Sequence, residues 1–487
     1  DTVVLAGSED DYILMSKDST SDIHKTINMT LDQGSLGSGS VLVVQKSSNP
    51  SGFIYIQSEV IRFADDITWL EFNENTGLIT GGIITSSFAN SSIKPYSKIV
   101  GANDRINFGV IGCKGMGWSD MRSILSHDGT DCIAICDVDD RVLEQRSNDV
   151  KKLTGKKPKV YKDYRKLLEN KDVDAVVIGT PDHWHCLMLV HALEAGKHIY
   201  CEKPISNSVK ESMIMLDKAK EHSKYLIQVG QWQRSSPHYR DALDYLWSGK
   251  LGQIRMVRVW AYQGWYGMLD PLPDSPVPKG VDYKSWLGPA PSRPFNTNRF
   301  HFNFRWYWDY AGGLMTDWGV HEIDIALFGM KVREPLSVVA SGGRFGYPDQ
   351  DTETPDTLQT LFQYENWTML WENAVGIDSG NYGQDEGIAF IGNDGTLVID
   401  RGGWQVRPEL DYQNNLPRHK KPKKIQPIAY TKARGSGLGY HTKNFIDAIR
   451  NNTPESLNCG IDSGSIALSL IHISEPTRLL SIGYGGF

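Results

Sequence analysis

The stretch Arg105-Ile-Asn-Phe-Gly-Val-Ile-Gly-Cys-Lys-Gly-Met-Gly-Trp118 decides the fold of the chain. Residues 106–111 are apolar and rich in β-branched side chains, which predicts a short strand buried on both faces. Glycines follow at once, and apolar residues then recur at helical spacing. A strand, a glycine turn and a helix start together form a phosphate site, because unpaired helix N–H groups and the helix dipole favour an anion.

A second predicted strand makes this signal more specific. The stretch Cys132-Ile-Ala-Ile-Cys136 has strand character and is followed by Asp137, close to where a dinucleotide-binding fold places its ribose-binding acid. Because a carboxylate there would repel a 2′-phosphate, the sequence favours NAD over NADP. The usual G-x-G-x-x-G pattern would put glycine at position 114, where this chain has Lys114. We therefore expect an altered contact with the pyrophosphate, to which Lys114 could supply a charge.

Length and composition exclude several classes of protein. The chain has 487 residues, which predicts two or three domains. Its net charge of -7 argues against a nucleic-acid or anionic-membrane partner. No apolar run is long enough to span a bilayer. The six cysteines show no paired metal-ligand spacing, so we expect reduced, buried thiols and no metal site.

The two ends of the chain differ from its middle. Residues 1–75 contain short β-like runs separated by polar residues and glycine, which predicts a small β-rich extension. Residues 76–104 are either a linker or the remnant of a signal peptide, since 77–89 resemble the second half of an export signal but no basic segment precedes them. A periplasmic location and a cytoplasmic one therefore both stay open. Residues 468–487 resemble a translated sequencing adapter, and we exclude them from the functional argument.

Strands and helices alternate regularly from residue 105 to 230. This alternation predicts a Rossmann domain, in which helices cover both faces of a parallel sheet and ligands bind at the carboxyl ends of the strands. Over residues 231–467, longer runs spaced for antiparallel pairing and a helix at about 313–328 predict a second, mixed α/β domain. The Rossmann strands are expected at residues 106–111, 131–136, 174–179, 197–201 and 226–229.

The strand ends of the Rossmann domain carry the predicted cofactor contacts. His183 and His185 follow one strand end and are expected to border the nicotinamide, although one of them is expected to be a packed, hydrogen-bonded core histidine. The predicted cofactor-binding residues are Gly112, Lys114, Gly115, Met116, Gly117, Asp137, Thr180, Pro181, His183, His185, Glu202 and Lys203.

Lys203 is a candidate catalytic residue in the motif Glu202-Lys-Pro204. A lysine just beyond a buried strand at the cofactor edge can hydrogen-bond a substrate hydroxyl and stabilise alkoxide character as a hydride leaves. The alternative is a surface lysine in a strand-to-helix turn, which is the commoner role of a lysine. The position at the binding edge favours the catalytic role.

Asp317 and His321 form a second candidate site. On a helix they lie four residues apart and share a face. A neutral imidazole is a natural general base near pH 7, and a carboxylate can fix its tautomer and orientation. The alternatives are a surface Asp–His pair or half of a metal site, but further metal ligands are missing nearby.

The segment 299–310 interleaves aromatic rings with hydrogen-bonding groups. Such a surface suits sugars, because rings stack on the apolar face of a sugar while polar groups bind its hydroxyls. The alternative is a core-packing loop, and we expect about half of the aromatic rings to serve that purpose. The predicted substrate-binding residues are Gln231, Arg234, Trp265, Arg299, His301, Trp306, Trp308 and Asp309.

Taken together, these motifs resemble a known family. From about 102 to 467 the chain resembles the glucose–fructose oxidoreductase/inositol dehydrogenase/rhizopine-catabolism (Gfo/Idh/MocA) family, and 286–291 and 296–310 resemble a bacterial branch whose members are often exported. The resemblance implies a Rossmann domain, a C-terminal α/β domain with an open, largely antiparallel sheet, and NAD(P)-dependent chemistry on sugars or cyclitols. It also implies that Lys203 and His321 handle the hydroxyl proton with support from Asp317, and that the open sheet forms a homo-oligomer, a dimer or a tetramer.

Three functions follow from this reading. The first is transfer of a hydride between nicotinamide and a sugar, glycoside or cyclitol hydroxyl. The second is a redox-neutral NAD-dependent glycosidase or lyase, which oxidises a sugar only transiently and shares the same first step. The third, a non-catalytic NAD- or sugar-binding protein, is the least favoured, because Lys203, Asp317 and His321 are all present.

Overall fold

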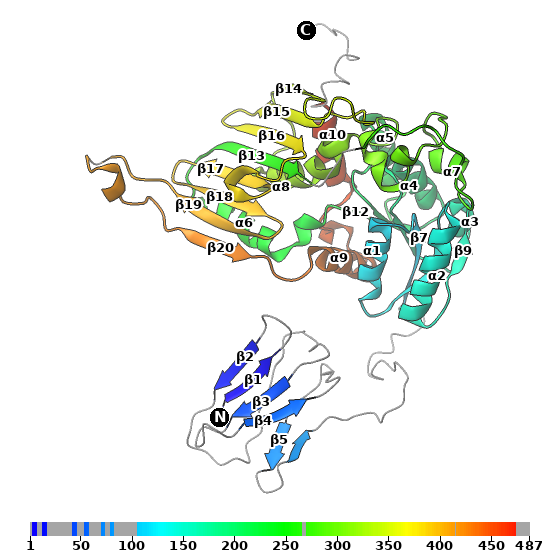
Figure 1. The fold of residues 1–487 in the computed structure, drawn as a ribbon, viewed down its shortest axis with the longest axis horizontal. Helices are drawn as coiled ribbons and strands as arrows, with labels where there is room; N and C mark the ends of the chain where they lie inside the picture. Colours follow the sequence, from blue (N-terminus) through cyan, green and yellow to red (C-terminus); the bar gives the residue numbers. More distant parts are fainter. Residues whose placement is uncertain are drawn as a thin grey trace. The chain divides into compact units, whose positions relative to one another are not determined.

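The computed structural model describes residues 105–264, 269–413 and 415–473, together with the backbone of six strands within the first 81 residues. The chain divides into two units, Asp1–Tyr96 and Ser97–Phe487, which we describe separately (Figure 1).

The first unit contains only strands in its described part, as expected for a β-rich extension. Four of them form an antiparallel sheet in the order β2-β1-β3-β4, and β5 and β6 form a hairpin. The signal-like stretch 77–89 overlaps β6, and otherwise lies outside the described residues. The strands are β1 (Thr2–Ala6), β2 (Tyr12–Ser16), β3 (Val41–Gln45), β4 (Phe53–Gln57), β5 (Leu70–Asn73) and β6 (Leu78–Gly81).

The second unit begins with a Rossmann domain, as the sequence predicts. Its six strands are all parallel and lie in the order β12-β11-β10-β7-β8-β9. The strand order reverses between β7 and β10, and ligands of such folds bind in the crevice outside the carboxyl ends of the strands at that point. The strands are β7 (Ile106–Ile111), β8 (Thr130–Cys136), β9 (Lys159–Tyr161), β10 (Ala175–Ile178), β11 (His198–Cys201) and β12 (Ile227–Val229).

Helices connect these strands, and local sequence signals define their ends. The side chain of Asp139 accepts a hydrogen bond from the Arg141 N–H at the start of α2, and Gly155 ends that helix with a φ of 80°. Ser208 caps α5 in the same way. The helices of this domain are α1 (Met116–Leu125), α2 (Asp140–Thr154), α3 (Tyr164–Leu168), α4 (His185–Glu194) and α5 (Val209–Glu221).

The second domain is built on an eight-stranded sheet in the order β14-β15-β16-β13-β17-β18-β19-β20. Only the pair β13–β16 is parallel, so the sheet is mixed and largely antiparallel, as expected. Asn393 and Asp394 join β17 to β18. The strands are β13 (Ile254–Gln263), β14 (Ser337–Gly343), β15 (Thr357–Gln363), β16 (Thr368–Val375), β17 (Glu386–Gly392), β18 (Gly395–Asp400), β19 (Gly403–Pro408) and β20 (Ile428–Lys432).

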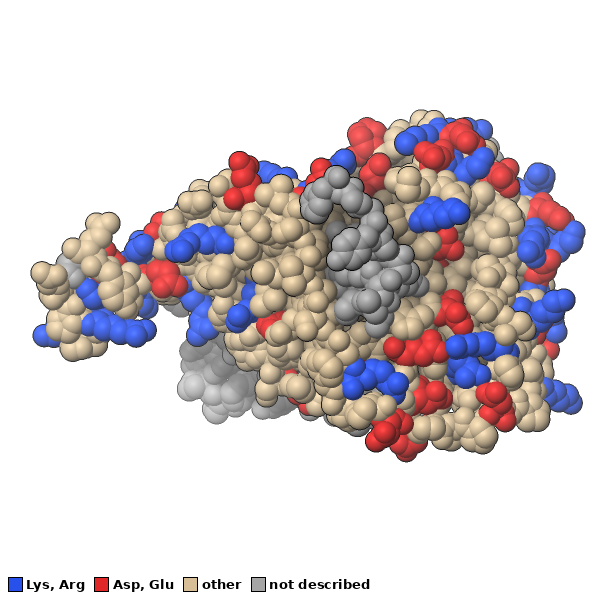
Figure 2. Space-filling model, turned by 90° about the horizontal axis from the view of Figure 1, so that it is seen from above, with Lys and Arg blue, Asp and Glu red and all other residues tan. Residues whose placement is uncertain are grey.

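Helices cover one face of this sheet. Helix α6 (Pro237–Trp247) packs on β18 and β19, and α8 (Val320–Met330) packs on β13 and β17. The other face presents apolar side chains to solvent, among them Met256, Val339 and Leu361. Each of these is at least 44% exposed, so the face is open. The segment between β19 and β20 projects from the sheet (Figure 1), and blue lysine and arginine side chains gather on it (Figure 2).

The helix expected at about 313–328 begins differently from a regular α-helix. Gly313 has a φ of 68°, which an α-helix cannot accommodate. A π-helical turn at Met315–Gly319 follows and leads into α8. Turns of this kind are frequent at functional sites, and this one carries Asp317.

The last two helices return to the Rossmann domain. Helix α9 (Gly437–Asn451) packs against α1, and α10 (Ile461–Ile473) packs against α5 and α8. The adapter-like stretch thus contributes its first residues, through Ile473, to α10, while 474–487 lie outside the described residues. Within the described residues, no helix is both long and apolar enough to cross a membrane.

Candidate active site

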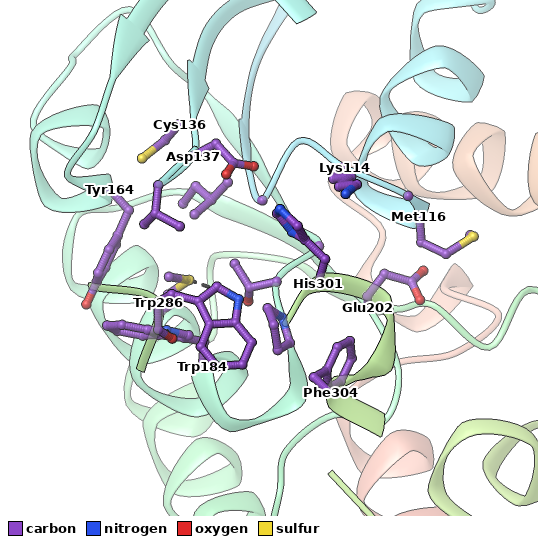
Figure 3. Close-up of a pocket in the computed structure, with 18 of the residues that line it drawn as sticks. Lys114, Met116, Cys136, Asp137, Tyr164, Trp184, Glu202, Trp286, His301 and Phe304 are labelled. Carbon is purple, nitrogen blue, oxygen red and sulfur yellow. Dashed lines mark hydrogen bonds between the residues drawn. The ribbon is translucent and has the colours of Figure 1, made fainter. Parts of the chain in front are cut away.

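A cavity of about 720 Å³ lies at the carboxyl ends of the Rossmann strands. Residues that follow β7, β8, β10 and β11 form one wall, and residues of the C-terminal domain, from 282–286 and 301–305, form the other. Figure 3 shows Asp137 and Tyr164 on one side of the cavity and Glu202 and Met116 on the other. Both domains therefore contribute to the site.

The glycine turn brings backbone unusually close to the cavity. Gly112 and Gly115 have φ values of 81° and 55°, which favour glycine. A Cβ on Gly117 would lie 2.1 Å from the Gly112 carbonyl oxygen, and one on Gly179 would lie 2.4 Å from the Gly117 Cα. The start of α1 is thus pressed against the ends of β7 and β10, and its N–H groups can cradle a diphosphate, with the exposed Lys114 beside them.

Asp137 is held beneath this turn. Its Oδ2 accepts a hydrogen bond from the Cys113 N–H at 2.8 Å, and its Oδ1 accepts one from the Asp139 N–H at 3.1 Å. Burial raises the pKa of Asp137, and these N–H groups oppose that rise. The carboxyl lines the cavity, and its contact with a ribose hydroxyl stays a prediction.

Lys203 and Asp317 meet at the Glu202 side of the cavity. The Lys203 Nζ donates to Asp317 Oδ1 and to the Asp317 carbonyl oxygen, both at 2.7 Å. The Nε of Arg305 lies 3.1 Å from Oδ2 of the same carboxylate. Burial by itself would raise the pKa of Asp317, but the positive charges of Arg305 and Lys203 outweigh burial and hold it well below its usual range. Asp317 is therefore ionised, and it orients Lys203.

His321 lies one turn further along, behind this pair. It is 5% exposed, does not line the cavity, and its Nδ1 has no hydrogen-bond partner among the described residues. Its ring centroid lies 6.2 Å from that of Trp232. Burial, and then the charges of Lys203 and Arg401, lower the pKa of His321 well below its usual value. The imidazole is therefore neutral near pH 7, and the same lowered pKa makes it a weak base.

His183 and His185 are both packed rather than exposed to the cavity. The Nε2 of His183 lies 3.1 Å from the Trp286 carbonyl oxygen, and burial lowers its pKa to about 4. The two ring nitrogens of His185 lie 2.7 Å and 2.9 Å from the carbonyl oxygens of Pro204 and Thr180. The sequence predicts one packed histidine here, and the structure packs both.

The aromatic segment 299–310 lies largely inside the fold. Phe302, Phe304 and Arg305 line the cavity, and so does His301, whose Nε2 lies 3.1 Å from Asp139 Oδ2. His301 thus lies near Lys114, at the cofactor end of the cavity. Burial, and then the charge of Lys114, lower the pKa of His301 to about 4.

The other residues expected to bind substrate form contacts within the protein and do not line the cavity. Each makes its contacts with other residues of the same unit, although the Nε2 of Gln231 and the Nε of Arg299 have no hydrogen-bond partner among the described residues. Arg299 pairs with Asp274, Trp308 donates to the Glu353 carbonyl oxygen, Asp309 pairs with Arg293, Arg234 pairs with Asp324, Gln231 contacts Cys459, and Trp306 is 2% exposed. Trp265 lies outside the described residues.

Asp182 is a cavity residue that sequence reasoning did not select. It follows Pro181, lines the cavity and is 6% exposed. Burial raises its pKa to about 8, although Lys203 and Arg305 act in the opposite direction. Its position in the sequence could have identified it, because Asp182 directly follows Thr180 and Pro181, which were predicted to bind the cofactor at the end of β10.

Comparison with known proteins places the chain in a family. A model described as the NAD-binding Rossmann fold of the GFO_IDH_MocA oxidoreductase family matches residues 106–231, and the model of its C-terminal alpha/beta domain matches 252–371. The chain belongs to this Gfo/Idh/MocA oxidoreductase family. The matched model describes an NAD-binding domain, which confirms the prediction that NAD is the cofactor.

Sequence relatives cover only part of this chain. An uncharacterized oxidoreductase, YrbE, from Bacillus subtilis (strain 168) is 28% identical over 242 residues, which are 49% of this chain and 58% of that protein. A glycosyl hydrolase family 109 protein from Shewanella baltica (strain OS185) is 33% identical over 159 residues, or 30% of this chain and 35% of that protein.

Solved structures share the fold at low sequence identity. A putative myo-inositol dehydrogenase from Sinorhizobium meliloti 1021 is 19% identical, with a TM-score of 0.53 over 78% of this chain and 98% of that one. The WlbA dehydrogenase from Bordetella pertussis, in complex with NADH and UDP-GlcNAcA, is 17% identical, with a TM-score of 0.54 over the same shares of the two chains.

Proposed function

We propose that the protein transfers a hydride between nicotinamide and a carbon that bears a hydroxyl group on a sugar, glycoside or cyclitol. The observation that carries this proposal is the Lys203–Asp317 pair, with an Nζ–Oδ1 distance of 2.7 Å, on the wall of the cavity at the carboxyl ends of the Rossmann strands. An ammonium group held in this way can stabilise negative charge on a substrate oxygen.

The residues divide the proton chemistry between them. Bound NAD supplies the hydride acceptor. Lys203 binds the substrate hydroxyl and stabilises its oxygen as the proton departs, and Asp317 keeps Lys203 oriented. The neutral imidazole of His321 accepts the proton through water, because it lies behind the cavity wall; burial and nearby cations lower its pKa, which keeps it unprotonated and makes it a weak base.

The sugar class of the substrate rests on relatives. Neighbours with the same fold include a putative myo-inositol dehydrogenase and an enzyme crystallised with UDP-GlcNAcA. The aromatic side chains of Trp286, Phe302 and Phe304 line the cavity, and such rings suit the apolar face of a sugar.

A redox-neutral glycosidase is the second candidate. The observation that favours it is the identity of 33% to a glycosyl hydrolase family 109 protein. In such a reaction bound NAD would supply a transient oxidation of the sugar, because the neighbouring C–H becomes acidic enough for elimination only beside a carbonyl. Lys203 and His321 would carry out the same first step.

One experiment separates these two functions. The purified protein is denatured and any released nucleotide is identified; NAD reduction by a panel of sugars is then measured beside cleavage of aryl glycosides without added cofactor. We expect sugar-dependent formation of NADH. Glycoside cleavage without net NADH would replace the first function by the second, and absence of any affinity for NAD would overturn both.

We also propose that the open face of the C-terminal sheet forms a homo-oligomer, a dimer or a tetramer. Val339 and Leu361 are paired neighbours on β14 and β15 and are 68% and 44% exposed, and Met256 on β13 is 49% exposed. Apolar groups in such a row favour contact with a second copy. Light scattering should report an oligomer that Leu361→Glu weakens, and a monomeric wild type would contradict the proposal.

A further inference from the structure

A cluster of buried oxygen atoms lies behind the wall of the cavity. Asp120, on α1, is 0% exposed, and neither of its carboxyl oxygens receives a hydrogen bond from a donor within the described residues. The same holds for Oε1 of Glu202 and for the hydroxyl of Tyr200, which is also 0% exposed. Because buried polar groups are nearly always hydrogen-bonded, the arrangement of these three side chains needs a physical explanation.

Glu202 connects this cluster to the cavity. It lines the cavity, is 5% exposed and precedes Lys203, whose N–H lies 3.3 Å from Glu202 Oε2. The other oxygen, Oε1, faces Gly230, where a Cβ would lie only 2.3 Å away. Glycine at position 230 therefore leaves space for this carboxyl.

Asp120 and Glu202 share one proton. Their carboxyl groups lie within hydrogen-bonding range of each other, and two carboxylates in contact within a dry site cannot both be charged. Burial, and then the charge of Glu202, raise the pKa of Asp120 well above its usual value. Burial also raises the pKa of Glu202, to about 7, but Lys203 opposes this rise. Because Lys203 acts on Glu202 and is not among the groups that act on Asp120, the negative charge is more stable on Glu202 and the proton is more stable on Asp120.

The negative charge of Glu202 offsets the excess positive charge at the Lys203 end of the cavity. Lys203 and Arg305 are two cations, and Asp317 is one anion that pairs with both. Burial raises the pKa of Asp182 to about 8, so this carboxyl is only partly ionised near that pH and contributes less negative charge than Asp317. Without a charge on Glu202 this end would be net positive, which would disfavour a cationic ring.

We propose that Asp120 and Glu202 act as an acid–carboxylate pair that makes the protein bind oxidised, cationic nicotinamide in preference to the reduced, neutral form. Glu202 supplies the negative charge at the cavity wall. Asp120 is a positioning residue, whose protonated carboxyl donates to Glu202 and holds it there. The proposal rests on the proposed function only in placing nicotinamide beside Lys203.

The test is the ratio of two dissociation constants, those for NAD⁺ and NADH, measured separately by calorimetry or fluorescence at pH 8. Glu202→Gln removes the charge and nearly preserves the shape. We expect the ratio of the NAD⁺ constant to the NADH constant to rise about tenfold in this variant. An unchanged ratio would overturn the proposal.

Two further variants keep the test decisive. Asp120→Asn retains a donor to Glu202 and cannot ionise, so its ratio should stay within about twofold of the wild type; a tenfold rise would show that Asp120 carries the charge and would overturn the assignment. Lys203→Met removes a cation and also the charge that keeps Glu202 ionised, so the two losses oppose each other; a rise in the ratio as large as that of Glu202→Gln would contradict the charge balance. These measurements report binding and do not depend on turnover. If the ratios of dissociation constants are as expected but every sugar and glycoside assay fails, only the proposed function is contradicted.

Discussion

Two buried carboxyl groups, Asp137 and Asp317, lie on the walls of the same cavity, and their pKa values move in opposite directions. Asp137 meets only backbone N–H groups, so burial dominates and its pKa rises. Asp317 meets the cations Lys203 and Arg305, which overcome burial and lower its pKa.

The difference follows from what each position has to recognise. A carboxyl that binds a neutral ribose hydroxyl needs acceptor oxygens and no nearby cation. A carboxylate that orients a charged lysine has to stay ionised, and the two cations keep it so. We therefore expect changes on the Asp317 side to abolish turnover and changes on the Asp137 side to weaken cofactor binding.

The largest effect is expected for Lys203→Met. The variant loses the ammonium that stabilises the substrate oxygen, so kcat should fall by at least about a thousandfold. Steady-state kinetics with the active sugar measure this fall. NAD should still bind with a dissociation constant in the same range, and loss of NAD binding together with activity would contradict the assigned role.

Asp317→Asn should lower both turnover and stability. It leaves Lys203 and Arg305 as buried cations with a neutral partner, which costs about 3 kcal/mol of the free energy of unfolding at neutral pH. Because the folded-state pKa of Asp317 lies below its unfolded value, the stabilisation is fully present above about pH 4 and is lost as the pH falls through the folded pKa. Urea unfolding from pH 8 downwards measures the difference between the two proteins. A difference that widens below pH 4 would refute this account.

Asp137→Ala should act on binding alone. The dissociation constant for NAD should rise about tenfold, because the ribose loses its acceptor, while kcat at saturating NAD stays within about twofold. The preference for NAD over NADP should also narrow, since the repulsion of a 2′-phosphate is removed. A large fall in kcat at saturation would show that the two walls of the cavity are not separate in function.

The smallest effect is expected at His301, which has a φ of 53° and faces Asp139. His301→Gly and His301→Ala both remove the ring, but glycine suits the backbone conformation and alanine does not. Both should raise the dissociation constant for NAD about threefold, and only alanine should lower the melting temperature. If glycine left NAD binding unchanged, the ring would have no part in holding the cofactor.

The Rossmann domain illustrates what local sequence signals can predict. The strand at 106–111 and the glycine turn are confirmed, because buried parallel strands and their turns have short-range signatures, and the role of Asp137 stays a prediction. The short strand β9 was missed, since it lies at the edge of the sheet and its side chains are largely exposed.

The aromatic segment shows the limit of such reasoning. Composition predicts a sugar-binding wall at 299–310, yet Arg299, Trp308 and Asp309 make their contacts inside the fold. Which ring faces a cavity depends on how a loop packs against strands far away in the sequence. The spacing of aromatic residues along the chain does not predict this packing. Asp120 was missed for the same reason, because its partner Glu202 lies on another element.

The sequence by itself determined the parallel nucleotide-binding sheet, the NAD cofactor and the candidates Lys203, Asp317 and His321, since strand ends, turns and helix spacing are local properties of a chain. Only the tertiary structure decided which of these groups meet. It paired Asp317 with Lys203 in the cavity and placed His321 behind them. The charges that result depend on burial and on neighbours brought together by folding.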